Sequence, residues 1–281
     1  MEFERLILLK RIMSEEYWRR LLEQNGKMYR QNVNSIKSIL NENRGFAAEI
    51  PTNECVLLLF SGGMDSTILV DVIVRKWNCK IILLYFRRNA RNQIFEEESV
   101  DYFFDFYKKR FPDNVLELQK LEIEIPSRVN KEYLDRARQN IMGLPLRNST
   151  MWDNAFAQAV FLSGKFKTTI RTIIVGSVKE DETSPESGIL SILAFNLHGC
   201  ISMGVWYYQL LAPFIDGTME KSYRKLDLLQ YAKQFQIPIE KTRSCFGSDK
   251  ESCGTCLACQ NRNKAYKEFN LLVNLKENKK M

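Results

Sequence analysis

The sequence predicts an α/β fold, in which a mostly parallel sheet carries helices on both faces, with a helical N-terminal extension and a cysteine-rich C-terminal tail. Short apolar runs of strand length alternate with amphipathic helical segments, which is typical of a parallel sheet covered on both sides. The first such run ends in a glycine turn that leads into a helix. Four of the seven cysteines fall within fifteen residues near the C-terminus.

The length and composition of the chain limit the number of domains and the class of protein. A chain of 281 residues can hold one large α/β domain with appendages, and we divide it at residues 1–50, 51–240 and 241–281. No apolar run approaches membrane-spanning length, and the first residues are too acidic for a signal peptide, so we expect a cytoplasmic protein without membrane contact. The net charge of +7 suits phosphate-bearing ligands, but the basic residues are spread along the chain.

Residues 1–50 precede the first strand and predict two helices. Ser14 before two glutamates is a typical helix start, and Asn25-Gly26 interrupts the pattern. A second helix then carries apolar residues at amphipathic spacing, namely Tyr29, Val33, Ile36 and Leu40. Two interpretations stay open: a helical pair packed on the domain surface, or an arm that binds a partner protein.

The apolar run from Cys55 to Phe60 predicts a buried parallel strand. The turn Ser61-Gly62-Gly63 follows it, and a helix begins with Asp65 or Ser66 near its N-cap. A strand, a glycine turn and a helix start place backbone N–H groups and the positive end of the helix dipole around an anion. The turn has neither a Walker lysine nor a G-x-G-x-x-G pattern, so it is not a P-loop or a dinucleotide site of the Rossmann type.

The string Ser61-Gly62-Gly63-Met64-Asp65-Ser66-Thr67 resembles the PP-loop of the ATP pyrophosphatase superfamily, whose fold is HUP-like, or adenine nucleotide alpha hydrolase-like. The resemblance implies that this turn binds ATP with Mg²⁺, that a substrate oxygen attacks the α-phosphate, and that a nucleophile then displaces AMP. Asp65 would orient the loop or the Mg²⁺. The implied ATP-binding residues here are Phe60, Ser61, Gly62, Gly63, Asp65, Ser66 and Thr67.

The remaining elements follow in order along the chain. We expect strands at residues 80–86, 115–125, 169–175 and 210–213, and helices around residues 133–137, from near Ser149, and from Thr218 to about Phe235. The basic run at residues 87–91 follows the second strand, at the end of the sheet that faces ligands in open α/β folds. It is either a solvated loop or a contact for an anionic substrate.

The clustered cysteines have the spacing C-x7-C-x2-C-x2-C and are Cys245, Cys253, Cys256 and Cys259. In a chain expected in the cytoplasm this spacing indicates a metal rather than disulfides. Four thiolates suit a structural, tetrahedral Zn²⁺. An iron–sulfur cluster is the alternative that four cysteines also allow.

A PP-loop domain that ends in this cysteine pattern, followed closely by Arg262, is similar to the 7-cyano-7-deazaguanine synthase family, QueC. The similarity covers roughly residues 53–267. Three further stretches agree in order. Residues 144–148 resemble a V-P-G-R-N motif, Gly176 with Asp181, Pro185 and Glu186 resembles a G-x-x-x-x-D…P-D loop, and Pro213 with residues 219–222 resembles a P…D-K-A-E segment.

This resemblance implies further roles. Arg147, Asn148 and Gly176 would join the ATP site, and Lys221 and Arg147 would offset phosphate charge. Asp65 and Lys221 are then the catalytic candidates. Lys221 is otherwise a surface lysine. Asp181 and Glu186 would accept hydrogen bonds from the guanine-like edge of the substrate; the alternative for these two is a solvated acidic loop.

The family's reaction adenylates 7-carboxy-7-deazaguanine, forms an amide with ammonia, and dehydrates the amide to a nitrile for queuosine biosynthesis. The chain departs from the family after its second strand, where Phe86 to Arg91 replace a Y-G-Q-x-H motif. The chain therefore resembles divergent relatives in antiviral defence gene clusters, for which a protein amine is a candidate nucleophile. We expect a homodimer. The alternatives are a PP-loop enzyme that modifies tRNA and a non-catalytic, nucleotide-binding interaction protein.

Overall fold

A computed structural model of the chain describes residues 14–26, 28–125 and 135–278. Its core is a five-stranded sheet in the order β3-β2-β1-β4-β5, with every neighbouring pair parallel. The strands are β1 (Cys55–Leu59), β2 (Lys80–Arg87), β3 (Val115–Glu122), β4 (Thr172–Ile174) and β5 (Gln209–Leu211). From β1 the chain adds β2 and β3 on one side and then β4 and β5 on the other. The strand order therefore reverses between β1 and β4, and open α/β sheets bind ligands at such a switch point.

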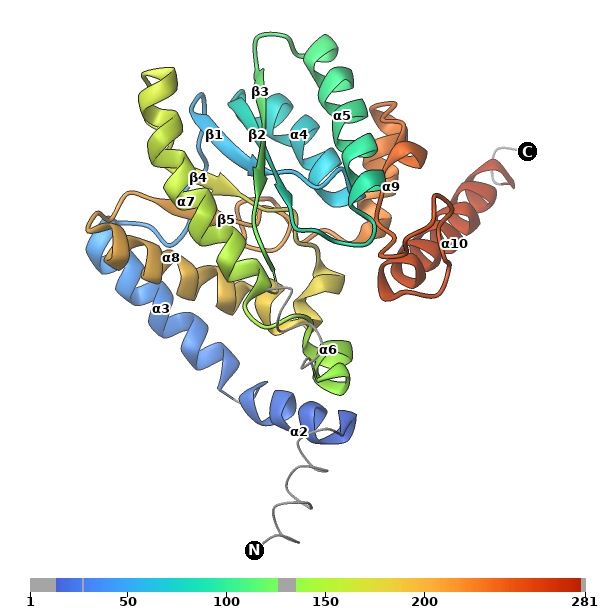
Figure 1. The fold of residues 1–281 in the computed structure, drawn as a ribbon, viewed down its shortest axis with the longest axis horizontal. Coiled ribbons are helices and arrows are strands. Elements are labelled where there is room, and N and C mark those ends of the chain that lie inside the picture. The colour runs from blue at the N-terminus through green and yellow to red at the C-terminus, as the bar shows by residue number, and fades with distance from the viewer. Residues whose placement is uncertain (1–13, 27, 126–134, 279–281) are drawn as a thin grey trace, which may run out of the picture.

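Helices cover both faces of the sheet, as the sequence predicts. One face packs against α4 (Met64–Trp77), α5 (Gln93–Arg110) and α9 (Lys225–Gln234). The other packs against α7 (Arg147–Phe166) and α8 (Ile189–Met203), and Figure 1 shows the two layers on either side of the strands. Alternation along β1 sends Val56 and Leu58 to the first layer and Leu57 to the second, so the strand is apolar throughout.

The N-terminal extension forms the two expected helices, α2 (Glu15–Gly26) and α3 (Tyr29–Arg44). Ser14 Oγ accepts the backbone N–H of Tyr17 (3.1 Å) at the start of α2. The helix α2 packs against α6 (Arg136–Met142), and α3 packs against α8 (Figure 1). At the end of α3, the Arg44 guanidinium donates to the backbone oxygen of Tyr208 (2.7 Å) next to β5, so the extension is fastened to the domain.

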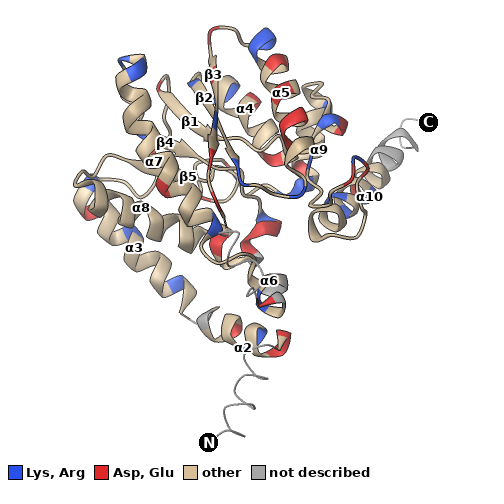
Figure 2. Ribbon diagram, in the orientation of Figure 1, with Lys and Arg blue, Asp and Glu red and all other residues tan. Residues whose placement is uncertain are grey.

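The last helix, α10 (Leu257–Asn278), packs against α9. Lys and Arg residues are distributed over many elements of the ribbon (Figure 2), which agrees with the spread of basic residues in the sequence. None of the helices in the described ranges combines the length and apolarity that a membrane span requires.

One expected helix boundary is wrong, and another differs by two residues. The helix expected from Thr218 begins instead at Lys225, because the Asp227 carboxylate accepts the backbone N–H of Arg224 (2.7 Å) and caps the helix there. The helix expected from near Ser149 begins at Arg147. The helix expected at residues 133–137 falls partly outside the described residues, and α6 begins at Arg136.

Candidate active site

A cavity of about 350 Å³ lies at the carboxyl ends of β1, β2 and β4. The residues predicted for ATP, substrate or catalysis that line it are Phe60, Ser61, Gly63, Asp65, Ser66, Arg147, Asn148, Gly176 and Asp181. Those that are outside its lining are Gly62, Thr67, Glu186 and Lys221. Most of the residues predicted for ATP and substrate therefore converge on one cavity from segments far apart in the sequence.

The glycine turn after β1 is held in one tight conformation. Gly62 has a φ of +66°, and a Cβ there would lie 2.8 Å from the Val100 nitrogen and 2.9 Å from the Ser99 Cβ, so only glycine fits without a shift. The Ser99 hydroxyl donates to the Gly62 carbonyl (2.7 Å). Gly62 thus shapes the turn from behind, while Ser61 and Gly63 face the cavity.

The first turn of α4 offers donors to an anion. Gly63 is the N-cap, with no side-chain cap, so the helix N-terminus is open toward the cavity. The hydroxyls of Ser61 and Ser66 lie 3.2 Å apart, and both residues line the cavity. Thr67 is fully buried and lies outside the lining.

Gly176, two residues after β4, lies close to the backbone at the start of α4. A Cβ at Gly176 would lie 2.9 Å from the Ser66 nitrogen and 3.2 Å from the Asp65 carbonyl carbon. Both of these atoms belong to backbone that cannot swing aside. The segment after β4 can therefore lie against the first turn of α4 only because residue 176 has no side chain.

A buried lysine binds the carboxylate of Asp65 beside this turn, and Asp181 lies near enough to act on its pKa. Lys225, the first residue of α9, is 8% exposed, and its Nζ donates to Asp65 Oδ2 (2.8 Å). Burial acts to lower the pKa of Lys225, but the nearby carboxylates of Asp65 and Asp181 outweigh it and raise the pKa overall. Burial raises the pKa of Asp181, although Lys225 opposes that shift.

Lys221, the lysine predicted to offset phosphate charge, lies outside the cavity lining. Its side chain is 60% exposed and binds Asp227 (2.5 Å). A helix that began at Thr218 would have placed Lys221 in its first turn, but α9 begins at Lys225, so Lys225 holds that position instead. Sequence reasoning missed Lys225 because it placed the helix start too early; the signal was Asp227, which can cap a helix that starts after Arg224.

The start of α7 forms the opposite wall with Arg147 and Asn148. The Asn148 amide donates to the Glu186 carbonyl (3.3 Å) and the Ser187 hydroxyl (3.2 Å). Burial, and then the neighbouring Arg88, lower the pKa of Arg147. Burial raises the pKa of Glu186, whose Oε1 has no hydrogen-bond partner among the described residues.

The cysteine cluster forms as predicted. The four sulfur atoms of Cys245, Cys253, Cys256 and Cys259 all lie within 4.8 Å of one another, close to the spacing of about 3.8 Å that tetrahedral Zn–S bonds of about 2.3 Å require. The backbone N–H groups of Gly247 and Cys253 donate to the Cys245 sulfur (3.2 and 3.3 Å). Such donors stabilise thiolates, so the residues present fit a metal.

Arg243 ties this cluster to the glycine turn. Its backbone N–H donates to the Gly62 carbonyl (3.0 Å). Its buried guanidinium donates to the carbonyls of Gly247 (2.9 Å), Asp249 (2.7 Å) and Lys250 (2.7 Å) in the loop between the first two cysteines. The loop that bears the cysteines and the turn that faces the cavity are thus held by one residue.

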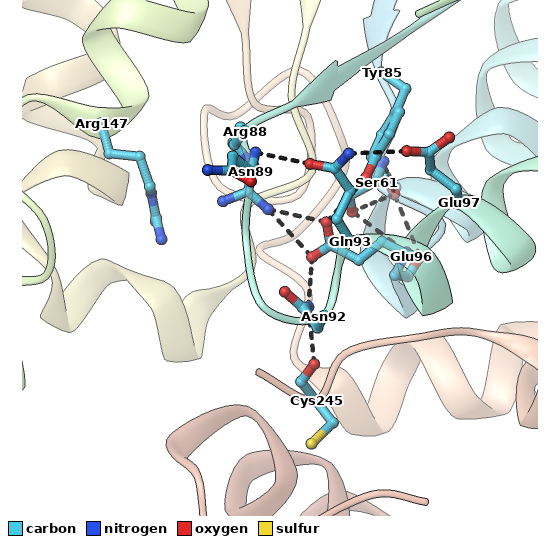
Figure 3. A network of polar contacts seen from close by, with 12 residues as sticks. Ser61, Tyr85, Arg88, Asn89, Asn92, Gln93, Glu96, Glu97, Arg147 and Cys245 are labelled. Atoms are coloured by element: carbon cyan, nitrogen blue, oxygen red, sulfur yellow. Dashed lines mark hydrogen bonds and ion pairs between the residues drawn. The ribbon is translucent and has the colours of Figure 1, made fainter. Parts of the chain in front are cut away.

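The basic run after β2 divides into two environments. Arg87 pairs with Glu97 (3.0 Å) and lies outside the cavity lining. Arg88 lines the cavity and pairs with Glu96 (3.0 Å), within the polar network drawn in Figure 3. Sequence reasoning left open whether this run faces solvent or a ligand site, and of its three arginines the structure places Arg88 in the lining of the cavity and Arg87 and Arg91 outside it.

Comparisons with known proteins show which family the chain is similar to. A family model described as queuosine biosynthesis protein QueC matches residues 55–270. A 7-cyano-7-deazaguanine synthase of Campylobacter concisus (strain 13826) is 25% identical over 75% of this chain and 93% of its own length. A protein of the same name from Methanothermobacter thermautotrophicus (strain Delta H) is 25% identical over 74% of this chain and 92% of its own.

Among solved structures, a U34-tRNA thiolase NcsA from Methanococcus maripaludis with its [4Fe-4S] cluster matches with a TM-score of 0.41 and 13% identity, over 89% of this chain and 75% of the other. The matched region 55–270 spans the sheet, the cavity and the cysteine cluster. The chain therefore belongs to the QueC family of queuosine biosynthesis proteins.

Proposed function

We propose that this protein is an ATP-dependent ligase, forming AMP and pyrophosphate, that adenylates the carboxylate of a 7-deazaguanine such as 7-carboxy-7-deazaguanine and joins it to an amine. The observation that carries the proposal is the meeting of the glycine turn with Lys225, Asp65 and Asp181 in one cavity. Membership of the QueC family and relatives named 7-cyano-7-deazaguanine synthase support the substrate class.

The nucleotide site in this proposal is the glycine turn and the first turn of α4. The backbone N–H groups there, with Ser61 and Ser66, bind the pyrophosphate part of ATP. Lys225 takes the charge-neutralising role first predicted for Lys221, because it lines the cavity and Lys221 does not. Arg147 adds charge from the opposite wall.

Asp65 is the candidate Mg²⁺ ligand. One of its oxygens binds Lys225, and the other, Oδ1, is buried without a hydrogen-bond partner among the described residues. Asp181 lies close enough to influence the same lysine. Carboxylate oxygens in this arrangement suit Mg²⁺, which is held in such sites by one or two carboxylates together with substrate phosphates.

The reaction then needs positioning and charge neutralisation more than a general base. The acceptor carboxylate oxygen attacks the α-phosphorus, which forms an acyl-adenylate and releases pyrophosphate. The amine nitrogen next attacks the acyl carbon, which forms the amide bond, expels AMP and loses a proton. Water must be excluded during the second step, and the enclosed wall of Phe86 and Trp152 contributes to that.

Several finer features belong to the same proposal. The amine is ammonia or a protein amine, and the product is an amide, the nitrile 7-cyano-7-deazaguanine or a protein conjugate. The four cysteines bind a structural Zn²⁺, which stabilises the C-terminal tail when bound. In the same proposal, the protein forms a homodimer and binds a partner protein through α2 and α3. It is located in the cytoplasm and acts in antiviral defence.

The test is to incubate the purified full chain with ATP, Mg²⁺, 7-carboxy-7-deazaguanine and either ammonia or candidate peptides, and to follow pyrophosphate release and product masses. We expect pyrophosphate only when the carboxylate is present. The double variant Ser61→Ala/Asp65→Ala should lose this release. Release at the wild-type rate by that variant, or release that does not depend on the 7-deazaguanine, would overturn the proposal.

A further inference from the structure

Arg88 is the cationic side chain that the end of β2 presents to the cavity. Its neighbour Arg87 pairs with Glu97 and Glu122 outside the lining. Arg88 donates to Glu96 through Nη2 alone, at 3.2 and 3.0 Å from the two carboxylate oxygens. In the described part of the chain its Nε and Nη1 donate no hydrogen bond, so donors remain for a ligand.

The Arg88 guanidinium is fixed in place before any ligand arrives. Glu96 also accepts hydrogen bonds from Asn92 (2.8 Å) and from the Tyr85 hydroxyl (3.3 Å). Asn92 in turn donates to the Cys245 carbonyl (2.9 Å). Figure 3 shows this chain of contacts running from the cysteine loop to Arg88. A side chain held this way loses little conformational entropy when it binds a ligand.

A second cation shares the space. Arg147 comes from α7, on the far side of the cavity, and Arg88 is the first charged neighbour to depress its pKa after burial itself. Within the described ranges, Arg147 has no carboxylate oxygen within 4.0 Å and donates only to Asn148 through Nε (3.1 Å). Arg88 therefore supplies a fixed fork of donors, and Arg147 supplies a guanidinium that forms no ion pair within the described residues, although Glu186, Glu96 and Asp181 lie near enough to act on its pKa.

The cavity that these arginines line also has apolar lining residues. Phe86, Met151 and Trp152 are among them, and Phe86 and Trp152 are 4% and 3% exposed. Apolar lining and a pair of guanidinium groups in one cavity suit a flat ring system that carries one anionic substituent.

We propose that Arg88 is the residue that binds the ionised carboxylate of the acceptor, and that it makes the site prefer a carboxylate to the neutral carboxamide of the same ring. This inference rests on the proposed function for the identity of the acceptor. The ATP phosphates are the other anions to consider. They have their own donors at the β1–β4 switch point, whereas Arg88 lies at the end of β2, on the other side of β1.

The test measures binding by calorimetry, with 7-carboxy-7-deazaguanine, the corresponding carboxamide and ATP as separate probes. Arg88→Gln should weaken carboxylate binding by about 10- to 100-fold, because a charged hydrogen bond is lost. Its affinities for the carboxamide and for ATP should change by less than about threefold. The matched control is Arg87→Gln, one residue away and outside the cavity, which should leave all three affinities unchanged.

Because Arg88→Gln leaves Glu96 without its cation, the double variant Arg88→Gln/Glu96→Gln guards against misfolding. It should regain thermal stability but not carboxylate affinity. The proposal is overturned if wild type binds carboxylate and carboxamide equally or binds neither, if Arg88→Gln keeps the wild-type preference, or if its loss is in ATP affinity.

Pyrophosphate release separates this inference from the proposed function. Suppose that the wild-type protein releases pyrophosphate only with 7-carboxy-7-deazaguanine, but that Arg88→Gln binds the carboxylate as tightly as wild type does. The proposed function would then be supported and the role of Arg88 refuted. If instead the protein prefers the carboxylate through Arg88 but releases no pyrophosphate, the binding site would be supported and the ligase activity refuted.

Discussion

Lys225 Nζ lies 2.8 Å from Asp65 Oδ2, which joins the first residue of α9 to the first turn of α4 across 160 positions of the sequence. This contact brings a buried cation to the glycine turn. A charge fixed beside the place where phosphate charge develops stabilises a transition state more than a mobile surface charge does, because it needs no reorganisation.

Replacing Lys225 should therefore affect catalysis far more than replacing Lys221. We expect Lys225→Met to lower kcat for pyrophosphate release by about 10²- to 10³-fold, and Lys221→Met, whose side chain is 60% exposed, to stay within about threefold. Lys225→Met also leaves Asp65 and Asp181 without their cation, so its thermal midpoint should fall, and adding Asp181→Asn should restore part of it. Equal losses for the two lysines would contradict the assignment.

Gly176 allows the segment after β4 to pack against the first turn of α4, and this contact can be tested. A Cβ there would meet the Ser66 nitrogen at 2.9 Å, so Gly176→Ala should push the segment after β4 off α4 and weaken ATP binding by tenfold or more, an effect of about 1.4 kcal/mol. Gly164→Ala in α7 is the control, since nothing lies within 4 Å of its added methyl group; it should stabilise the helix by about 0.5–1 kcal/mol. Calorimetry with ATP and thermal unfolding measure the two effects, and ATP affinity unchanged by Gly176→Ala would refute the close contact.

The sequence could predict those parts of the site whose geometry is local. The turn after β1 and the cysteine cluster depend on glycines and spacings within a few residues, and both form as expected. Lys225 was missed because the start of α9 depends on a cap by Asp227 that competes with an earlier start. Of the two adjacent arginines, only Arg88 reaches the cavity, because α5 places Glu97 against one and Glu96 against the other. Such choices are made by tertiary contacts that a linear pattern does not contain.

Metal removal should affect the cavity as well as the tail. Cys256→Ser is expected to lose the bound metal and to lower the thermal midpoint, because a structural metal contributes to folding. ATP affinity should fall with it, since Arg243 holds both the cysteine loop and the Gly62 carbonyl. Elemental analysis and visible absorption distinguish zinc from an iron–sulfur cluster. The control is Ser252→Ala, an exposed neighbour, and a fully stable, metal-free Cys256→Ser protein would rule out the structural role.

The stability of the protein should respond to pH through Glu186. Burial raises the pKa of this carboxyl above its ordinary value of 4.5, and its Oε1 has no hydrogen-bond partner among the described residues. The folded state thus favours the protonated form. The stability linked to that proton is fully present below pH 4.5 and is lost as the pH rises through the folded-state pKa.

Glu186→Gln replaces the carboxyl with a neutral group of the same shape, so it should unfold at a higher temperature than wild type near pH 7. The difference should shrink as the pH is lowered and vanish below about pH 4.5, where wild type is protonated in both states. Thermal unfolding measured at a series of pH values tests this, with Glu220→Gln at an exposed position as the control. A lower midpoint than wild type near pH 7 would mean that the ionised carboxylate is stabilised by its Asn148 and Arg147 neighbours more than burial opposes it. A difference that is constant with pH would mean that it does not arise from ionisation of Glu186.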